Sequence, residues 1–270
     1  MELNKIYCID ALEGLKQLED NSIDLIVTSP PYDTLRTYNG CPFNFIKDYP
    51  TEMYRVLKNG GIVVWVVGDK VEDGSESLSS FKQALMFKEI GFKVHDTMIY
   101  QKDSFPCPEA NRYLQCFEYM FIFSKGTPKT FNPIQIFTQS YKPSTSSTKR
   151  YPNGETKLLK YEQGKRYRNR ENIWKYGVGY LKSSKNAIAF EHPAIFPEKL
   201  AEDHILSWIN EGNIILDPFM GSGATAVACK KLNRNYIGFE ISAEYCIIAD
   251  KRLLQTNVMA TKKDYGGYFK

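Results

Sequence analysis

The sequence predicts an α/β fold built on a doubly wound, mostly parallel β-sheet. Short apolar runs alternate with amphipathic segments along most of the chain, which is the order that strand–helix units produce. The apolar runs, such as IVVWVV at 62–67, are continuous rather than alternating, as in parallel strands buried on both faces. Glycines follow two of the amphipathic segments, where a residue of positive φ commonly ends a helix.

In the first half of the chain, apolar runs, prolines and glycines delimit the predicted elements. The run SIDLIVTS is cut short by two prolines, so we expect a buried strand that ends there. The segment TEMYRVLKNGG is expected to be a helix that ends at its glycine pair, and a second helix is expected to end just before Gly91. The predicted elements are a strand at 22–29, a helix at 51–61, a strand at 62–69, a helix at 79–91, and strands at 93–102 and 119–126.

The second half repeats this alternation with shorter strands. The segment EKLAEDHILSWIN is amphipathic, and the apolar runs NIILD and YIGFE each precede a segment with helical periodicity. The predicted elements are a helix at 198–210, a strand at 213–217, a helix at 222–233, a strand at 236–240 and a helix at 242–255. Trp65 and His204, inside predicted elements, are expected to serve the structure rather than the chemistry.

One stretch, residues 139–170, has no sustained apolar period. Nine basic residues against two acidic ones give it a net charge of +7, whereas the whole chain carries only +4. Four tyrosines are interleaved with the basic residues. A solvated, partly disordered loop and an inserted nucleic-acid-contacting region both account for this composition. The candidate DNA-binding residues are Lys149, Arg150, Lys165, Arg166, Arg168 and Arg170.

The composition restricts the class of protein. A hydrophobic content of 43% and a charged content of 24% over 270 residues are typical of a soluble globular protein. The N-terminus lacks the apolar core of a signal peptide, and no apolar run approaches the roughly 20 residues that a membrane helix needs. We therefore predict a cytoplasmic protein that does not enter a membrane. The six cysteines form no CxxC pair, so reduced thiols and no metal site are expected.

Two predicted strand ends carry residues suited to ligand binding. DPFMGSG, at 217–223, lies between a strand and a helix, where open α/β sheets bind nucleotide-type ligands. It contains only Gly221-x-Gly223, so the full dinucleotide fingerprint is absent. Glu240 ends the next strand, where a carboxylate can accept hydrogen bonds from both ribose hydroxyls. The pattern suits an adenosine-containing ligand such as S-adenosylmethionine; a tight βα turn without a ligand is the alternative.

Three motifs together resemble those of the amino-methylating DNA methyltransferases. They are TSPPY at 28–32, EHPAIFPEKL at 191–200 and DPFMGSG at 217–223. Enzymes of this family transfer a methyl group from S-adenosylmethionine to an exocyclic amino nitrogen of cytosine or adenine. The order of the motifs, with the basic stretch between the first two, is similar to that of the β class. The resemblance covers most of residues 4–33, 51–125 and 186–255.

The resemblance also implies a domain organisation and partners. It predicts a Rossmann-like methyltransferase domain formed by residues 1–126 and 186–270, with an inserted target-recognition region at 127–185. Double-stranded DNA is the implied substrate. A cognate restriction endonuclease that acts separately and a homodimer are both compatible with the resemblance.

The same resemblance assigns the site residues. Asp10 and Ala11 are expected near the adenine edge of the cofactor, although Asp10 also suits the N-cap of a helix. His192 to Pro197 are expected to cover the methionine part, and the ribose is assigned to Glu240. The implied cofactor-binding residues are Asp10, Ala11, His192, Pro193, Ala194, Phe196, Pro197, Asp217, Pro218, Phe219, Gly221, Ser222, Gly223 and Glu240.

The catalytic residues are expected in SPPY, namely Ser29, Pro30, Pro31 and Tyr32. An aromatic amino group is a poor nucleophile because its lone pair is delocalised into the ring. Two acceptors aimed at its N–H bonds, Ser29 Oγ and the Pro30 carbonyl, would draw the lone pair back to nitrogen. The prolines hold that carbonyl in place, and Tyr32 offers a face on which a flipped base can stack.

The sequence leaves the target atom and the substrate class open. Ser29 favours cytosine N4 as the methylated atom, because many adenine-N6 members of the family carry Asp there. Cys107 lies in a Pro–Cys dipeptide such as the carbon-5 cytosine methyltransferases use, but the motif order argues against covalent catalysis. An RNA or protein-amide methyltransferase and a non-catalytic nucleic-acid-binding protein are two less favoured interpretations of the same residues.

Overall fold

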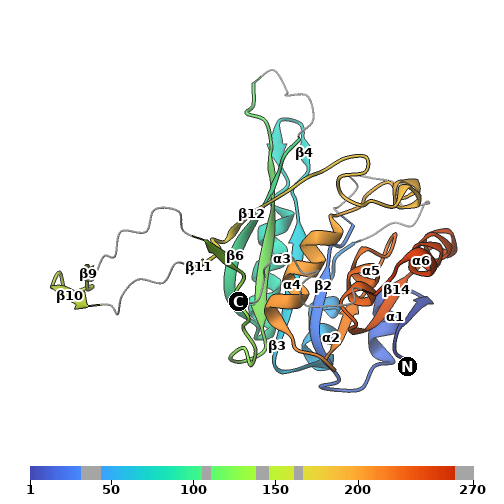
Figure 1. Cartoon of the computed structure of the whole chain (residues 1–270), viewed down its shortest axis with the longest axis horizontal. Coiled ribbons are helices and arrows are strands. Elements are labelled where there is room, and N and C mark those ends of the chain that lie inside the picture. The colour runs from blue at the N-terminus through green and yellow to red at the C-terminus, as the bar shows by residue number, and fades with distance from the viewer. Residues whose placement is uncertain (32–43, 105–110, 138–145, 161–166, 259–270) are drawn as a thin grey trace.

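The fold is an eight-stranded sheet with helices on both faces (Figure 1). The computed structural model describes residues 1–31, 44–104, 111–137, 146–160 and 167–258. The strands of the sheet lie in the order β1-β14-β13-β2-β3-β7-β6-β12. Strand β7 runs antiparallel to β3 and β6, and all other pairings in this sheet are parallel. The predicted α/β fold with a mostly parallel sheet is therefore confirmed.

The main sheet consists of β1 (Lys5–Cys8), β2 (Ile23–Thr28), β3 (Leu57–Val67), β6 (Lys93–Lys102), β7 (Phe117–Ser124), β12 (Ile173–Tyr176), β13 (Ile214–Asp217) and β14 (Asn235–Glu240). Six of these eight strands overlap predicted strands. Three small two-stranded sheets accompany it: β4 (Val71–Glu72) with β5 (Ser75–Glu76), β8 (Gln135–Phe137) with β11 (Tyr167–Asn169), and β9 (Ser146–Arg150) with β10 (Thr156–Lys160). Strands β1 and β12 were not among the predicted elements.

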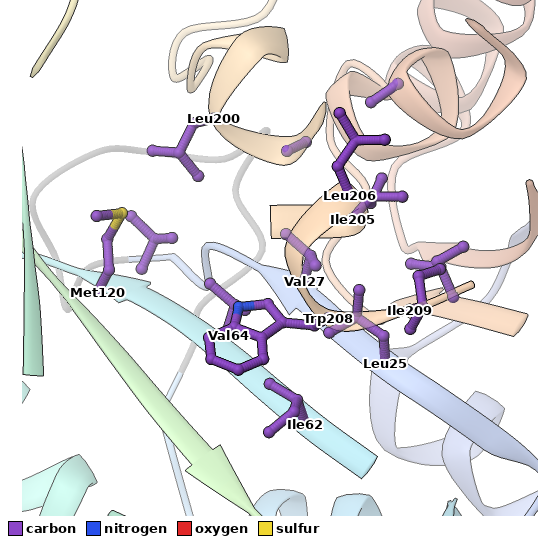
Figure 2. Packing of buried hydrophobic residues seen from close by; sticks show 14 of the residues in the cluster. Leu25, Val27, Ile62, Val64, Met120, Leu200, Ile205, Leu206, Trp208 and Ile209 are labelled. Atoms are coloured by element: carbon purple, nitrogen blue, oxygen red, sulfur yellow. The ribbon is translucent and has the colours of Figure 1, made fainter. Parts of the chain in front are cut away.

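Helices cover the two faces of the sheet because successive side chains of each strand point to opposite sides. Leu25 and Val27 of β2 pack into one apolar cluster and Ile26 packs into the other. The helices are α1 (Ala11–Lys16), α2 (Asp48–Val56), α3 (Ser79–Ile90), α4 (Glu198–Trp208), α5 (Ala224–Lys231) and α6 (Ala243–Gln255), with a 3₁₀ turn η1 (Ala187–Glu191). Helices α1 to α3 contribute to the cluster of Ile26, while α4 and α5 cover that of Leu25 (Figure 2).

The helix predicted at 51–61 ends earlier than expected. Helix α2 ends at Val56, and the glycine pair belongs to β3. The register between β2 and β3 jumps from Ile23↔Leu57 to Leu25↔Ile62, so the residues between Leu57 and Ile62 bulge out of the ladder. Gly60 has a φ of +83°, and a Cβ on Gly61 would lie 2.9 Å from the Asp24 carbonyl oxygen. The glycines permit this bulge rather than capping a helix. Gly91, with a φ of +118°, does end α3 as predicted.

The predicted insertion at 127–185 is only partly separate from the main sheet. Strand β12 lies within it and pairs with β6, and Ile134 is buried in the core. Strands β9 and β10 lie away from the main sheet, at the left of Figure 1. The edges of the predicted insertion therefore do not coincide with the edges of the sheet domain.

Two predicted structural residues are buried in the core as expected. Trp65 is fully buried, and its Nε1 donates to Gln83 Oε1 over 2.8 Å. His204 is also fully buried, and burial lowers its pKa to about 3. This imidazole is therefore neutral at physiological pH and serves packing. Within the described ranges, no helix is long and apolar enough to cross a bilayer.

Candidate active site

A cavity of about 1020 Å³ lies at the carboxyl edge of the sheet, where β14, β13, β2 and β3 end. It is large for a small-molecule site, which typically has about 300–1,000 Å³. The cavity brings together segments far apart in sequence, from Asp10 to Tyr245. The predicted site residues that line it are Asp10, Ala11, Ser29, Pro30, Pro31, His192, Pro193, Ala194, Phe196, Pro218, Phe219, Gly221, Ser222 and Glu240.

Glu240 lies at the end of β14 with only 9% of its surface exposed. Its Oε2 accepts a hydrogen bond from the Gly221 N–H at 2.8 Å, and its Oε1 accepts one from the Ser242 N–H at 2.9 Å. Burial raises the pKa of the carboxyl, and these backbone donors offset part of that effect. Each carboxylate oxygen can accept a further bond, so the group fits a ribose diol in the cavity.

The glycine turn is shaped by close neighbours. Gly221 has a φ of +52°, and a Cβ there would lie 3.1 Å from His192 Nε2. Gly223 has a φ of +83°, and a Cβ there would lie 2.9 Å from the Cβ of Ala249. Any side chain at either position would strain the turn or displace its neighbour. The two predicted cofactor motifs are thus in direct contact through Gly221 and His192.

His192 belongs to the wall of the cavity rather than to its chemistry. Its ring is buried, its Nδ1 accepts a hydrogen bond from the Ala194 N–H at 3.1 Å, and it packs against the ring of Tyr245. These contacts hold the residues after His192 against the glycine turn. Pro197, also predicted to bind the cofactor, occupies the N-cap position of α4 and is not among the residues that line the cavity.

Asp10 is the N-cap of α1, a role that the sequence offered beside cofactor binding. Its Oδ1 accepts hydrogen bonds from the backbone N–H groups of Leu12 at 2.9 Å and Glu13 at 3.1 Å at the start of α1. Asp10 also lines the cavity, and the neighbouring Ala11 does so too. Contact of these residues with the adenine edge stays a prediction.

Asp217 lies behind the cavity wall and not on it, contrary to the predicted cofactor contact. It is 1% exposed, and its Oδ1 accepts hydrogen bonds from Thr28 Oγ1 at 2.6 Å and from the Phe219 N–H at 3.1 Å. Burial raises the pKa of this carboxyl to about 6. Asp217 therefore ties the end of β2, directly before Ser29, to the turn that follows β13.

The SPPY segment ends β2 as its prolines predict. The last pairing of β2 with β3 is Thr28↔Trp65, and the next residues turn into the cavity. Because two successive residues without an N–H cannot continue a ladder, the strand stops here. Pro30 is buried, and Ser29 is partly buried. Tyr32 and Cys107 lie outside the described residues.

The same cavity extends beyond Ser29 to a part that the motifs did not reveal, and we call this part the second compartment. In the sheet, β13 and β14 lie on one side of β2, while β3, β7 and β6 lie on the other. On this other side, Lys102 Nζ pairs with Glu118 Oε1 at 2.5 Å. The residues of the second compartment include Gly68, Asp69, Tyr100, Lys102, Phe117 and Glu118. Only the antiparallel direction of β7 brings Phe117 and Glu118 to this edge, and an apolar run does not indicate its direction.

The predicted DNA-binding residues are spread over two small sheets. Lys149 and Arg150 are exposed on β9, and the ring of Tyr151 lies 5.4 Å from Lys149 Nζ and 5.5 Å from Lys157 Nζ. Arg168 on β11 is half exposed and pairs with Glu171. Lys165 and Arg166 lie outside the described residues.

Arg170 has a structural environment that argues against contact with DNA. Its guanidinium pairs with the buried Asp203 at 3.0 Å. It also lies 4.7 Å from the ring centre of Trp174 and 5.5 Å from that of Tyr176. These contacts pair the guanidinium within the protein and fix the end of the basic stretch to α4. Arg170 is therefore removed from the candidate phosphate contacts.

The fold and the cavity together define a class of enzyme. A doubly wound sheet carries a buried carboxylate at the end of β14, a glycine turn without a pyrophosphate fingerprint, and a second compartment beside a Ser–Pro–Pro strand end. This combination is that of an S-adenosylmethionine-dependent methyltransferase. Residues 23–251 match the N6/N4 methyltransferase family, described as DNA methylase. The chain belongs to this family, with the motif order of its β class, and S-adenosylmethionine is its methyl donor.

Individual relatives cover nearly the whole chain. The orphan methyltransferase M.BamHII of Bacillus amyloliquefaciens is 54% identical over 94% of this chain and 97% of its own length. The type II methyltransferase M.HpaI of Haemophilus parainfluenzae is 32% identical over 92% of this chain and 74% of its own.

Solved structures of the same fold include two that are informative here. A complex of M1.HpyAVI with S-adenosylmethionine is 27% identical, covers 92% of this chain and 98% of its own, and has a TM-score of 0.58. The PvuII cytosine-N4-specific DNA methyltransferase, 22% identical, covers 94% of this chain and 87% of its own with a TM-score of 0.66. The latter shows the fold alone.

Proposed function

We propose that this DNA amino-methyltransferase methylates N4 of a cytosine that is flipped out of duplex DNA at a specific sequence. The observation that carries the proposal is Ser29, which lies in the cavity between the cofactor side and the second compartment. Adenine N6 is the alternative atom. A separate restriction endonuclease is compatible with this role, and so is an independent enzyme such as the relative described as an orphan methyltransferase.

In this proposal, the protein activates the amino nitrogen by accepting a hydrogen bond from each of its two N–H groups. Ser29 Oγ and the Pro30 carbonyl are the acceptors, and the rigid Pro30 and Pro31 keep the carbonyl oriented before the base arrives. The bound cofactor supplies an electrophilic methyl group. Asp217, through Thr28, holds the end of β2 at a fixed position relative to the glycine turn. The two reactants are thereby oriented without a covalent intermediate.

The second compartment is proposed to hold the flipped base. Tyr100 and Phe117 provide apolar surface there, and the Lys102–Glu118 pair provides polar groups near the ring edge. Stacking of the base on Tyr32 stays a prediction, because that residue lies outside the described part of the chain. Flipping is required because the amino group is inaccessible to the cavity while the base is stacked in a duplex.

The product identifies the methylated atom directly. We expect unmethylated genomic DNA, treated with the enzyme and S-adenosylmethionine and digested to nucleosides, to yield N4-methyl-2′-deoxycytidine by mass and retention time. N6-methyl-2′-deoxyadenosine as the only product would establish the alternative base. 5-Methylcytosine would contradict direct transfer and point back to Cys107. Total RNA treated in parallel is expected to stay unmethylated.

We propose that the β9–β10 pair binds the phosphate backbone of DNA. Its exposed cations are expected to release counterions from the duplex, with a slope of about −0.9 in log K against log salt for each phosphate contacted. The triple replacement of Lys149, Arg150 and Lys157 by alanine is therefore expected to flatten the slope by up to about 2.7, since three contacts are removed. The measurement is affinity for duplex DNA at several salt concentrations.

Arg170→Ala is the matched control for this experiment. It removes a cation of the same stretch that is held by Asp203, so it is expected to lower the melting temperature and leave the salt slope unchanged. Coinciding slopes for the wild type and the triple variant would show that β9 and β10 do not contact phosphates. In both variants, binding of S-adenosylmethionine is expected to stay intact.

A further inference from the structure

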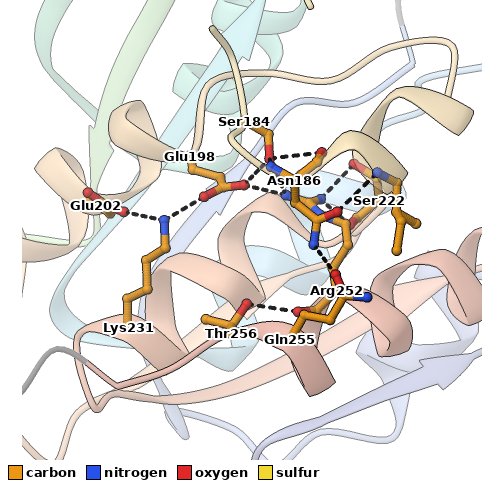
Figure 3. Close-up of polar contacts among 10 residues, drawn as sticks. Ser184, Asn186, Glu198, Glu202, Ser222, Lys231, Arg252, Gln255 and Thr256 are labelled. Atoms are coloured by element: carbon orange, nitrogen blue, oxygen red, sulfur yellow. Dashed lines mark hydrogen bonds and ion pairs between the residues drawn. The ribbon is translucent and has the colours of Figure 1, made fainter. Parts of the chain in front are cut away.

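A buried cation on α6 lies directly behind the glycine turn. The side chain of Arg252 is only 1% exposed. One terminal nitrogen donates hydrogen bonds to the Ser222 carbonyl and, at 3.0 Å, to Ser222 Oγ. The other donates to Glu198 Oε1 at 2.6 Å and to Ser184 Oγ at 3.5 Å (Figure 3). A charge this deeply buried is tolerated only because it is paired and hydrogen-bonded.

Arg252 joins two walls of the cofactor side that are not continuous in sequence. Ser222 lies in the glycine turn and lines the cavity, whereas Glu198 is the first residue of α4 and follows the segment His192 to Pro197 directly. Ser184 Oγ donates to the same Glu198 oxygen at 2.5 Å. The guanidinium itself is not among the residues that line the cavity.

Glu198 has a second cation that does not reach the turn. Lys231 Nζ on α5 pairs with Glu198 Oε2 at 2.5 Å and with Glu202 Oε1 at 3.1 Å. Lys231 therefore shares the carboxylate with Arg252, but the described structure gives it no bond to Ser222. Substitutions of Arg252 and of Lys231 can therefore distinguish the contribution of this network to stability from its effect on the glycine turn.

We propose that Arg252 is a positioning residue that sets the affinity for S-adenosylmethionine without touching it. The turn contains Gly221 and Gly223, whose backbone has more conformational freedom than that of any other residue type. Two hydrogen bonds from a fixed guanidinium, to the carbonyl and to Oγ of Ser222, restrict that freedom before the ligand binds. The same guanidinium fixes α4 and with it the wall that follows His192.

The planar fork of arginine is what this role requires. One nitrogen faces Ser222 and the other faces Glu198, so both partners are held at once. A lysine carries the same charge on a single nitrogen and cannot hold both in this geometry. Arg252→Lys therefore keeps the ion pair available and removes the fork.

The test compares Arg252→Lys with Lys231→Met by calorimetric titration of S-adenosylmethionine. Arg252→Lys is expected to raise the Kd about tenfold, the effect of losing one charge-assisted hydrogen bond. The kcat at saturating cofactor and the DNA affinity are expected to stay at wild-type values. Lys231→Met is expected to lower the melting temperature and leave the Kd within about twofold, since it does not touch the turn.

An unchanged Kd in Arg252→Lys, or equal increases in both variants, would overturn the proposal. If Arg252→Lys does not fold, Glu198→Gln loosens the same guanidinium while keeping an oxygen acceptor. It must then raise the Kd more than Lys231→Met does, and an equal or smaller increase would also overturn the proposal. The inference rests on the cofactor and not on the base, so a product other than N4-methylcytosine leaves it unaffected.

Discussion

Replacement of Ser29 by alanine is expected to lower kcat by about 10²–10³-fold, the effect of losing one preorganised acceptor or donor at a reacting group. Ser29 lies in the cavity between the cofactor side and the second compartment, and its Oγ is one of two proposed acceptors for the amino group. The Pro30 carbonyl remains in the variant, so residual activity is expected. Single-turnover transfer of a labelled methyl group to DNA measures the chemical step directly.

Cofactor affinity distinguishes a catalytic role of Ser29 from a structural one. The Kd for S-adenosylmethionine is expected to stay within about twofold in Ser29→Ala, because Glu240 and the glycine turn, the proposed cofactor contacts, follow β14 and β13 rather than β2. Ser75→Ala, the same change at an exposed position of β5, provides the control and should turn over at the wild-type rate. Full activity in Ser29→Ala would remove Ser29 from the mechanism.

Much of the fold was predictable because a continuous apolar run in the sequence indicates a buried strand without any knowledge of its neighbours. Strands β2 and β14 fall close to their predicted ranges for this reason. Strand β1 is only four residues long and lies at the sheet edge. Strand β12 follows the basic stretch and alternates exposed and buried residues. Neither presents a continuous apolar run, so neither was recognised.

The site was predictable only where its residues lie in local motifs. Glu240 and Gly221, which line the cavity, could be singled out because strand ends and glycine turns have a signature in the sequence. Asp217 and Arg170 were assigned to ligands, although each is committed to a buried protein partner. A sequence shows the charge of a side chain but neither its burial nor its partner. Arg252 went unnoticed for the same reason, since a charged residue in an amphipathic helix is expected at the surface.

The replacement of Glu240 by alanine is expected to weaken binding of S-adenosylmethionine by about 10²-fold or more. The carboxylate is assigned to both ribose hydroxyls, and a hydrogen bond to a charged group contributes roughly 1.5–3 kcal/mol. The variant also leaves the N–H groups of Gly221 and Ser242 without their acceptor, so the turn loses a support. Calorimetric titration of the free enzyme measures the effect without any contribution from DNA.

Glu240→Gln separates the charge from the hydrogen bonds. The amide keeps one acceptor oxygen, so we expect an affinity between those of the wild type and Glu240→Ala. Burial raises the pKa of Glu240, so the carboxylate of the free enzyme is protonated at a higher pH than an exposed one. The wild-type affinity is therefore expected to fall as the pH is lowered through that raised pKa, because a protonated carboxyl accepts fewer hydrogen bonds. The amide variant does not titrate, so its affinity should not fall over this pH range.

An affinity that is unchanged in Glu240→Ala would contradict the ribose assignment and move the adenosine to another part of the cavity.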